Sequence, residues 1–119
     1  MATNGQNFEI YQGDNKVIVI TIKDDDNNLV NLTGYNAVWC VHNFSPYQIM
    51  LQKRTGGEGI AIPNPLSGQL EITLEQVDTE TMITKIYGHQ CEIEDGSGHH
   101  ATVATGSVSV LKSVTHAEF

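Results

Sequence analysis

Apolar and polar residues alternate along most of this chain, and no stretch of ten or more residues repeats with the period of a helix. The strongest example is the segment 16–23, where Ile18, Ile20 and Ile22 share one face of an extended chain. Clusters of Gly, Asn, Asp and Pro interrupt the alternation at short intervals, as is typical of strands joined by tight turns. The sequence therefore predicts an all-β sandwich or barrel.

Seven or eight mostly antiparallel strands are expected from these segments, and residues 75–84 offer one helical turn at most. In the last predicted strand, residues 99–112, the apolar positions change from odd to even numbers: Val103 is odd, whereas Val108 and Val110 are even. An extra residue in one strand of a pair produces such a change, so we expect a β-bulge at Gly106. The predicted strands cover residues 8–10, 16–23, 35–42, 47–53, 60–62, 70–74, 86–94 and 99–112.

A chain of 119 residues, 39% of them hydrophobic, is long enough for one core and is close to the commonest domain size. We therefore expect a single domain over residues 1–119. Alternation places Trp39 inside this core and directs Cys40 and His42 to the opposite face. The inward positions that we expect to form the core are Phe8, Ile10, Ile18, Ile20, Ile22, Leu32, Trp39, Leu70, Ile72, Leu74, Tyr87, Ile93, Val108 and Val110.

The charge balance narrows the range of partners. Fourteen acidic residues against six basic ones give a formal net charge of −8, which disfavours nucleic acid and anionic membrane surfaces. Apolar runs such as residues 17–20 are too short to span a membrane, and the first ten residues resemble no secretory signal. We expect no nucleic-acid or membrane partner, and a protein folded in a reducing cytoplasm with Cys40 and Cys91 as free thiols.

Two patterns have part of the spacing of a metal site. Asp24-x-Asp26-x-Asn28 has the first three ligands of a calcium loop, but Leu29 and Tyr35 stand where such a loop needs Gly and Glu. We therefore interpret this segment as a solvated turn.

The second pattern combines Cys40-x-His42 with His89-x-Cys91, which could supply a Cys₂His₂ zinc set if the two strands were neighbours. Alternation directs the first pair outward and the second pair into the core, so we expect no metal and no other cofactor. The chain also contains no GxSxG, GxGxxG or Walker pattern. No catalytic residue is assigned, and an enzyme is not expected.

Four motifs in order support a family resemblance over residues 7–116. They are Phe8-x-Ile10 with Gly13-Asp14, Leu32-Thr33-Gly34, Leu74-x(4)-Thr79 followed by Tyr87, and Gly106-x-Val108-x-Val110 followed by Val114-Thr115. In this order they resemble the immunoglobulin-like N-terminal domain of phage baseplate upper proteins and related small virion and tail proteins. Lys85 and Gln90 depart from the pattern, since that family commonly has Gly and Asp there.

The resemblance implies an immunoglobulin-like β-sandwich and a non-enzymatic structural role in a bacteriophage virion. Capsid decoration and a small tail or baseplate component both stay open, with other virion proteins as partners and a homo-oligomer as one form of assembly. The alternative is a carbohydrate- or receptor-binding module that uses exposed Tyr11, Tyr35 or Tyr47 as stacking platforms.

The segment 16–23 supplies the candidate protein interface, because its second face is apolar too. Val17 and Val19 lie on this face, whereas strands in a two-layer sandwich usually turn polar side chains outward. We expect these valines to be covered either by the N-terminal segment of the chain or by another subunit.

Overall fold

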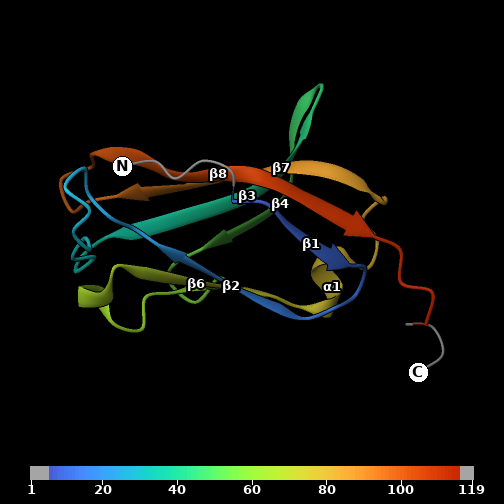
Figure 1. Ribbon diagram of the computed structural model, residues 1–119, viewed down its shortest axis with the longest axis horizontal. Helices are drawn as coiled ribbons and strands as arrows, with labels where there is room; N and C mark the ends of the chain where they lie inside the picture. The colour runs from blue at the N-terminus through green and yellow to red at the C-terminus, as the bar shows by residue number, and fades with distance from the viewer. Residues whose placement is uncertain (1–5, 116–119) are drawn as a thin grey trace.

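Eight strands form two sheets that pack face to face in the computed structural model, which describes residues 6–115 (Figure 1). This architecture confirms the predicted all-β sandwich of seven to eight strands. The expected domain limits of 1–119 include residues 1–5 and 116–119, which lie outside the described residues. The elements are β1 (Phe8–Tyr11), β2 (Lys16–Thr21), β3 (Asn36–Phe44), β4 (Tyr47–Arg54), β5 (Ile60–Ala61), the 3-10 turn η1 (Pro65–Ser67), β6 (Gln69–Leu74), α1 (Gln76–Thr79), β7 (Lys85–Glu94) and β8 (His100–Leu111).

The strand order is that of an immunoglobulin-like sandwich. The larger sheet has the order β1-β8-β7-β3-β4 and the smaller one β2-β6-β5. In immunoglobulin nomenclature, β8, β7, β3 and β4 correspond to strands G, F, C and C′. The strands β2, β6 and β5 of the smaller sheet correspond to B, E and D. Only β1 and β8 pair in parallel, among the ladders of the described residues. The hydroxyl of Tyr87 donates to the carbonyl of Ile83 at 2.7 Å, as at an immunoglobulin tyrosine corner.

The core lies between the two sheets and is centred on Trp39, which is completely buried. The rings of Phe8 and His89 pack against it, with centroids 6.5 and 5.9 Å from that of the indole. Twelve of the fourteen predicted core residues are buried, while Phe8 and Ile18 are partly buried and packed against the rest. Alternation along each strand therefore identified the correct inner face.

The predicted bulge at Gly106 is wrong in position. Cys91 pairs with Ala104 and Glu92 with Thr102, so Val103 is the extra residue, and Val103 and Ala104 are both buried. The parity change that the sequence showed is real, but it occurs three residues before the glycine.

Gly106 has a different role, because the N-terminal segment passes directly over it. Any side chain there would collide with the backbone of Gln6, whose amide donates to the carbonyl of Thr105 at 3.1 Å. The amide of Ser107 donates to the Asn7 side chain at 2.9 Å. Glycine thus lets the chain before β1 lie against the edge of β8.

The α-helical turn predicted near Thr79 is present as α1, whereas the 3-10 turn η1 was not predicted from the sequence. The turn α1 is held to the edge of the larger sheet by an ion pair of 2.7 Å between Lys53 and Asp78, both largely shielded from solvent. Within residues 6–115, neither helical segment has the length or apolar character needed to cross a membrane.

Candidate functional site on the outer face of the larger sheet

The hairpin that joins β3 to β4 carries aromatic and aliphatic side chains on its outward side. Phe44 pairs with Tyr47 and His42 with Ile49, so the four side chains lie on the face opposite Trp39. Tyr47 is 76% exposed and Phe44 50%. Ile86 of β7, 61% exposed, belongs to the same face because it lies two positions before Gly88, the partner of His42. We call His42, Phe44, Tyr47, Ile49 and Ile86 the hairpin surface.

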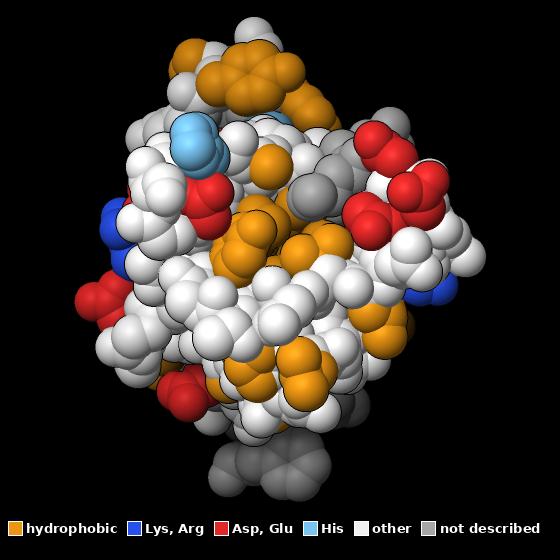
Figure 2. Space-filling model, turned by 90° about the vertical axis from the view of Figure 1, so that its left-hand side faces the viewer, with side chains coloured by type: hydrophobic (Ala, Val, Ile, Leu, Met, Phe, Trp, Pro, Cys, Tyr) orange, Lys and Arg blue, Asp and Glu red, His pale blue; other side chains and the backbone are white. Residues whose placement is uncertain are grey.

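The tip of this hairpin rises out of the sandwich, as the green loop at the top of Figure 1 shows. In the turned view of Figure 2, hydrophobic side chains gather at the top of the molecule, above its main body. The register between β3 and β4 shifts after Val41, and this irregularity leaves Met50 as an extra residue in β4. A bulge bends the strand that contains it, which explains why the tip departs from the plane of the sheet.

The rings of the hairpin surface hold one another in place. His42 contacts Phe44 edge-on at a centroid distance of 5.5 Å and lies 5.4 Å from Tyr47, while Phe44 and Tyr47 are 6.4 Å apart. Gly88 lies beneath them, and any side chain there would collide with the rings of His42 and Phe44. The aromatic cluster therefore rests directly on the backbone of β7, in an arrangement fixed before any partner arrives.

A hollow of about 440 Å³ occupies the other end of the same outer face. Its floor comes from the outward residues Val38 and Cys40 of β3, and its walls carry charged and polar groups from β4, β7 and β8. We call it the outer hollow; the lining residues used below are Val38, Cys40, Arg54, Gln90, Glu92 and His100.

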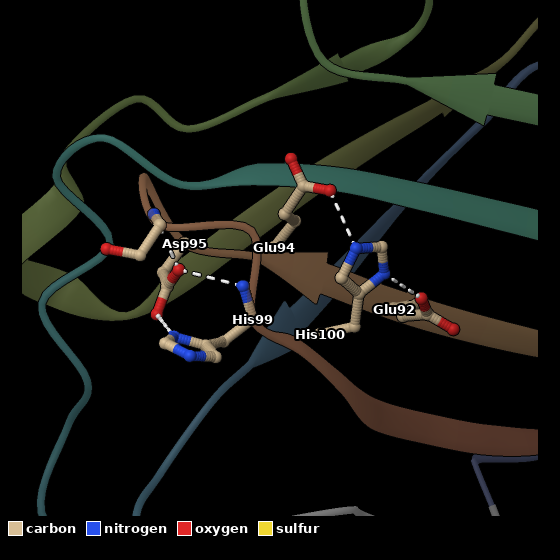
Figure 3. A network of polar contacts seen from close by, with 6 residues as sticks. Glu92, Glu94, Asp95, His99 and His100 are labelled. Atoms are coloured by element: carbon tan, nitrogen blue, oxygen red, sulfur yellow. Dashed lines mark hydrogen bonds and ion pairs between the residues drawn. The ribbon is translucent and has the colours of Figure 1, made fainter.

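His100 at the rim of the outer hollow lies between two carboxylates (Figure 3). Its Nδ1 is 2.7 Å from Glu92 Oε1, and its Nε2 is 2.7 Å from Glu94 Oε2. The hydrogen bond to Glu92, with the nearby charge of Glu94, raises the pKa of His100. The next turn is held by Asp95, whose pKa is lowered chiefly by backbone N–H groups that donate to its carboxylate. The charged groups at this rim are thus already paired.

The two Cys-His pairs lie on opposite faces, as their parity predicted. Cys40 and His42 are on the outer face, whereas His89 and Cys91 are buried beside Trp39. Burial raises the pKa of Cys40, and it raises that of Cys91 to about 12. Both cysteines are free thiols, and residues 6–115 contain no group of three or more His, Cys, Asp or Glu side chains that could hold a metal ion.

The calcium-like segment forms a turn. The Asp24 carboxylate accepts the backbone amides of Asp26 and Asn28, each at 2.9 Å, so one carboxylate oxygen is used in closing the loop. This geometry is that of an Asp-capped turn.

Val17 and Val19, the interface candidates from the sequence, lie on the outward face of the smaller sheet. They are 56% and 48% exposed, on β2 at the edge of that sheet. The structure does not bring them together with the hairpin surface, which belongs to the other sheet. Of the proposed tyrosine platforms, Tyr11 and Tyr47 are exposed, whereas Tyr35 is partly buried against the core.

Sequence reasoning missed the hairpin surface because it is assembled across strands. The local signal was partial: Phe44 shares the parity of Cys40 and His42, which the sequence directs outward. Tyr47 shares the parity of Leu51, which lies beside the buried Val41, and it faces outward only because Met50 is an extra residue. The contributions of Ile86 and Gly88 depend on which strand pairs with β3, and alternation within one strand does not give that information.

Comparison with known proteins adds no family. No protein-family model matches the chain, and a search of curated proteins finds no match either. The fold itself is established by the strand order, and the phage setting stays a proposal that rests on the four sequence motifs.

Proposed function

We propose that this chain is a non-enzymatic structural protein of a bacteriophage virion that acts through protein–protein contacts. It would serve as a capsid decoration protein or as a small tail or baseplate component, folded in the host cytoplasm and then built into the particle. The observation that carries the proposed contact role is the hairpin surface, an exposed cluster of apolar and aromatic side chains. Such clusters mark interaction sites on soluble proteins. The assignment to a phage rests on the sequence resemblance.

The chemistry of the hairpin surface supports binding to another protein. Aromatic side chains supply much of the binding energy at interfaces, particularly where they are rigid and lose little freedom on binding. Phe44 and Tyr47 meet this condition, since each packs against His42 and the other. The net charge of −8 would favour encounter with a basic neighbouring protein and would affect the rate of association more than its strength.

The test is incorporation into particles. The double variant Phe44→Ser with Tyr47→Ser should stay folded, because each side chain is at least half exposed, and should be lost from purified virions. Tyr11→Ser is the matched control, as Tyr11 is 51% exposed on another strand. Mass spectrometry of the particles measures copy number, and circular dichroism checks folding. A folded double variant with wild-type copy number would refute the proposed contact role of the hairpin.

A carbohydrate- or receptor-binding module is the second candidate, favoured by the exposure of Tyr47 beside Phe44. Sugars stack on exposed aromatic rings and bond to polar groups nearby, and Arg54 and Glu92 lie on the same face of the sheet. Glycan-array binding by the isolated chain that disappears in Tyr47→Ser would support this function. Absence of glycan binding, with loss of the variant from particles, would favour the structural role.

A further inference from the structure

The projecting hairpin tip and the outer hollow lie at opposite ends of one sheet face. Val38 in the floor of the hollow and Phe44 near the tip are six positions apart on β3, or about 20 Å at the usual strand rise. A second copy, turned about a twofold axis that runs between the faces and across the strands, would reverse this order. Each tip would then stand over the hollow of the other copy, which is the geometry of a closed symmetric dimer.

Two rows of outward positions across the middle of this face contain no Asp, Glu, Lys or Arg. Two chains that each carry a charge of −8 repel one another over most of their surfaces, so an uncharged band of this kind is where such copies can approach. Strand pairing places these positions side by side: Cys40, Gln52, Gln90 and Thr105 in one row, and His42, Ile49, Gly88 and Ser107 in the next.

The outer hollow suits an aromatic tip. Its volume of about 440 Å³ falls in the range of pockets that hold small ligands. Val38 and Cys40 provide an apolar floor, and the Arg54 guanidinium can stack on a ring face. The carboxylate of Glu92 can accept the hydroxyl of a tyrosine. The tip itself, from Phe44 to Met50, carries no charged residue that would oppose the acidic rim.

We infer that the hairpin surface binds a second copy of this chain, with Tyr47 of each copy entering the outer hollow of the other. The inference rests on the proposed function, because it names the partner of the same surface. It predicts a dimer held by two identical tip-to-hollow contacts.

Sedimentation velocity over a range of protein concentrations tests the dimer. The wild-type chain should form a dimer that dissociates on dilution. Tyr47→Ser removes the tip, and Val38→Arg fills the hollow with a charged side chain. Each should raise the dimer Kd by at least about thirtyfold, the effect of one interface hot spot. Val17→Ser with Val19→Ser, on the other sheet, is the control and should leave the dimer intact.

A mixing experiment separates the proposed contact from general damage to the fold. A Val38→Arg chain keeps its tip and a Tyr47→Ser chain keeps its hollow, so a mixed dimer recovers one of the two contacts while either variant alone has none. Native mass spectrometry of an equimolar mixture should therefore show a share of mixed dimers well above that expected from random pairing. Equal loss in the mixture would overturn the tip-to-hollow geometry.

Other outcomes identify another occupant. A wild-type chain that stays monomeric at its highest soluble concentration overturns the inference. If, in that case, Phe44→Ser with Tyr47→Ser is still lost from particles, the proposed function stands and the partner is a different virion protein. A dimer that is abolished by the Val17 and Val19 substitutions, but not by Tyr47→Ser, would place the self-interface on β2 instead.

Discussion

The indole Nε1–H of Trp39 donates a hydrogen bond of 3.1 Å to Nδ1 of His89 in the centre of the sandwich. Because Nδ1 accepts, the ring proton lies on Nε2, which donates to the backbone carbonyl of Gln6. One neutral imidazole thus links the core tryptophan to the segment that precedes β1. Protonation of Nδ1 would break the first of these bonds.

The stability of the fold should accordingly fall in mild acid. Burial lowers the pKa of His89 below its ordinary value of 6.5. Between the folded and the unfolded pKa, the unfolded chain binds a proton at this histidine and the folded chain does not. The stabilisation that neutral His89 provides is therefore complete above about pH 6.5 and decreases as the pH falls toward the folded pKa. His89→Gln keeps a hydrogen-bonding side chain without the titration, and its unfolding free energy should depend less on pH between 7.5 and 5 (about the range in which histidine titrates).

His100 contributes to the pH dependence of stability with the opposite sign, so variants are needed to separate the two histidines. Its raised pKa gives stability that is complete below pH 6.5 and is lost as the pH rises through the folded value. Chemical denaturation of wild type, His89→Gln and His100→Gln at each pH separates the two contributions. Identical pH dependence in wild type and His89→Gln would contradict the role assigned to the buried imidazole.

Truncation of the central tryptophan should be the most costly core substitution. Trp39→Ala removes a fully buried indole and leaves a cavity, so we expect a loss of about 3–5 kcal/mol in the free energy of unfolding. Urea denaturation measures it, with Tyr11→Ala as an exposed aromatic control. A loss below about 1 kcal/mol would mean that the indole does not support the core.

A methyl group at Gly106 should loosen the N-terminal segment. Gly106→Ala would collide with the Gln6 backbone, and overpacking of this kind costs about 1–3 kcal/mol. Gly96→Ala is the matched control, because a side chain at that position meets open space. Hydrogen exchange should show faster exchange of the Gln6 amide in Gly106→Ala alone. Equal behaviour of the two variants would argue against close packing of Gln6 on β8.

The two thiols should differ sharply in reactivity in the native state. Cys91 is fully buried with a pKa of about 12, whereas Cys40 is only partly buried on the outer face. A thiol reagent at pH 8 should modify Cys40 slowly and leave Cys91 intact, and denatured protein without reductant should show two free thiols. Cys40→Ser should then leave no reactive thiol in the folded chain. Stoichiometric zinc in purified protein would contradict the expectation of metal-free cysteines.

Alternation along single strands was sufficient to predict the fold class and most of the core. It gave Trp39 and Ile72 their correct faces because each lies in a strand without an extra residue, and Val108 its correct face because the extra residue of β8 comes before it. It misplaced the bulge because the parity of Val103 and Val108 shows that an extra residue exists, but not where. Ala104 is small enough to fit either face, so nothing in the sequence pointed to that position rather than to the glycine.

The candidate site was less accessible to sequence reasoning. Val17 and Val19 were visible because two residues of one strand suffice to define them. The hairpin surface combines Phe44 and Tyr47 with Ile86, more than forty positions from Phe44 along the chain, and it depends on Gly88 beneath the rings. Such a surface exists only once strand pairing and register are known.

The parallel pairing of β1 with β8 also decides how the sandwich responds to force. Phe8 lies opposite Val108 and Tyr11 opposite Leu111, so both strands point the same way along the sheet edge (Figure 1). A pull that draws β1 toward its N-terminal end and β8 toward its C-terminal end slides one strand along the other. The hydrogen bonds between them are then stretched together in shear, whereas strands peeled from one end lose their bonds singly. The pair acts as a mechanical clamp that must slip before tension reaches the layers around Trp39.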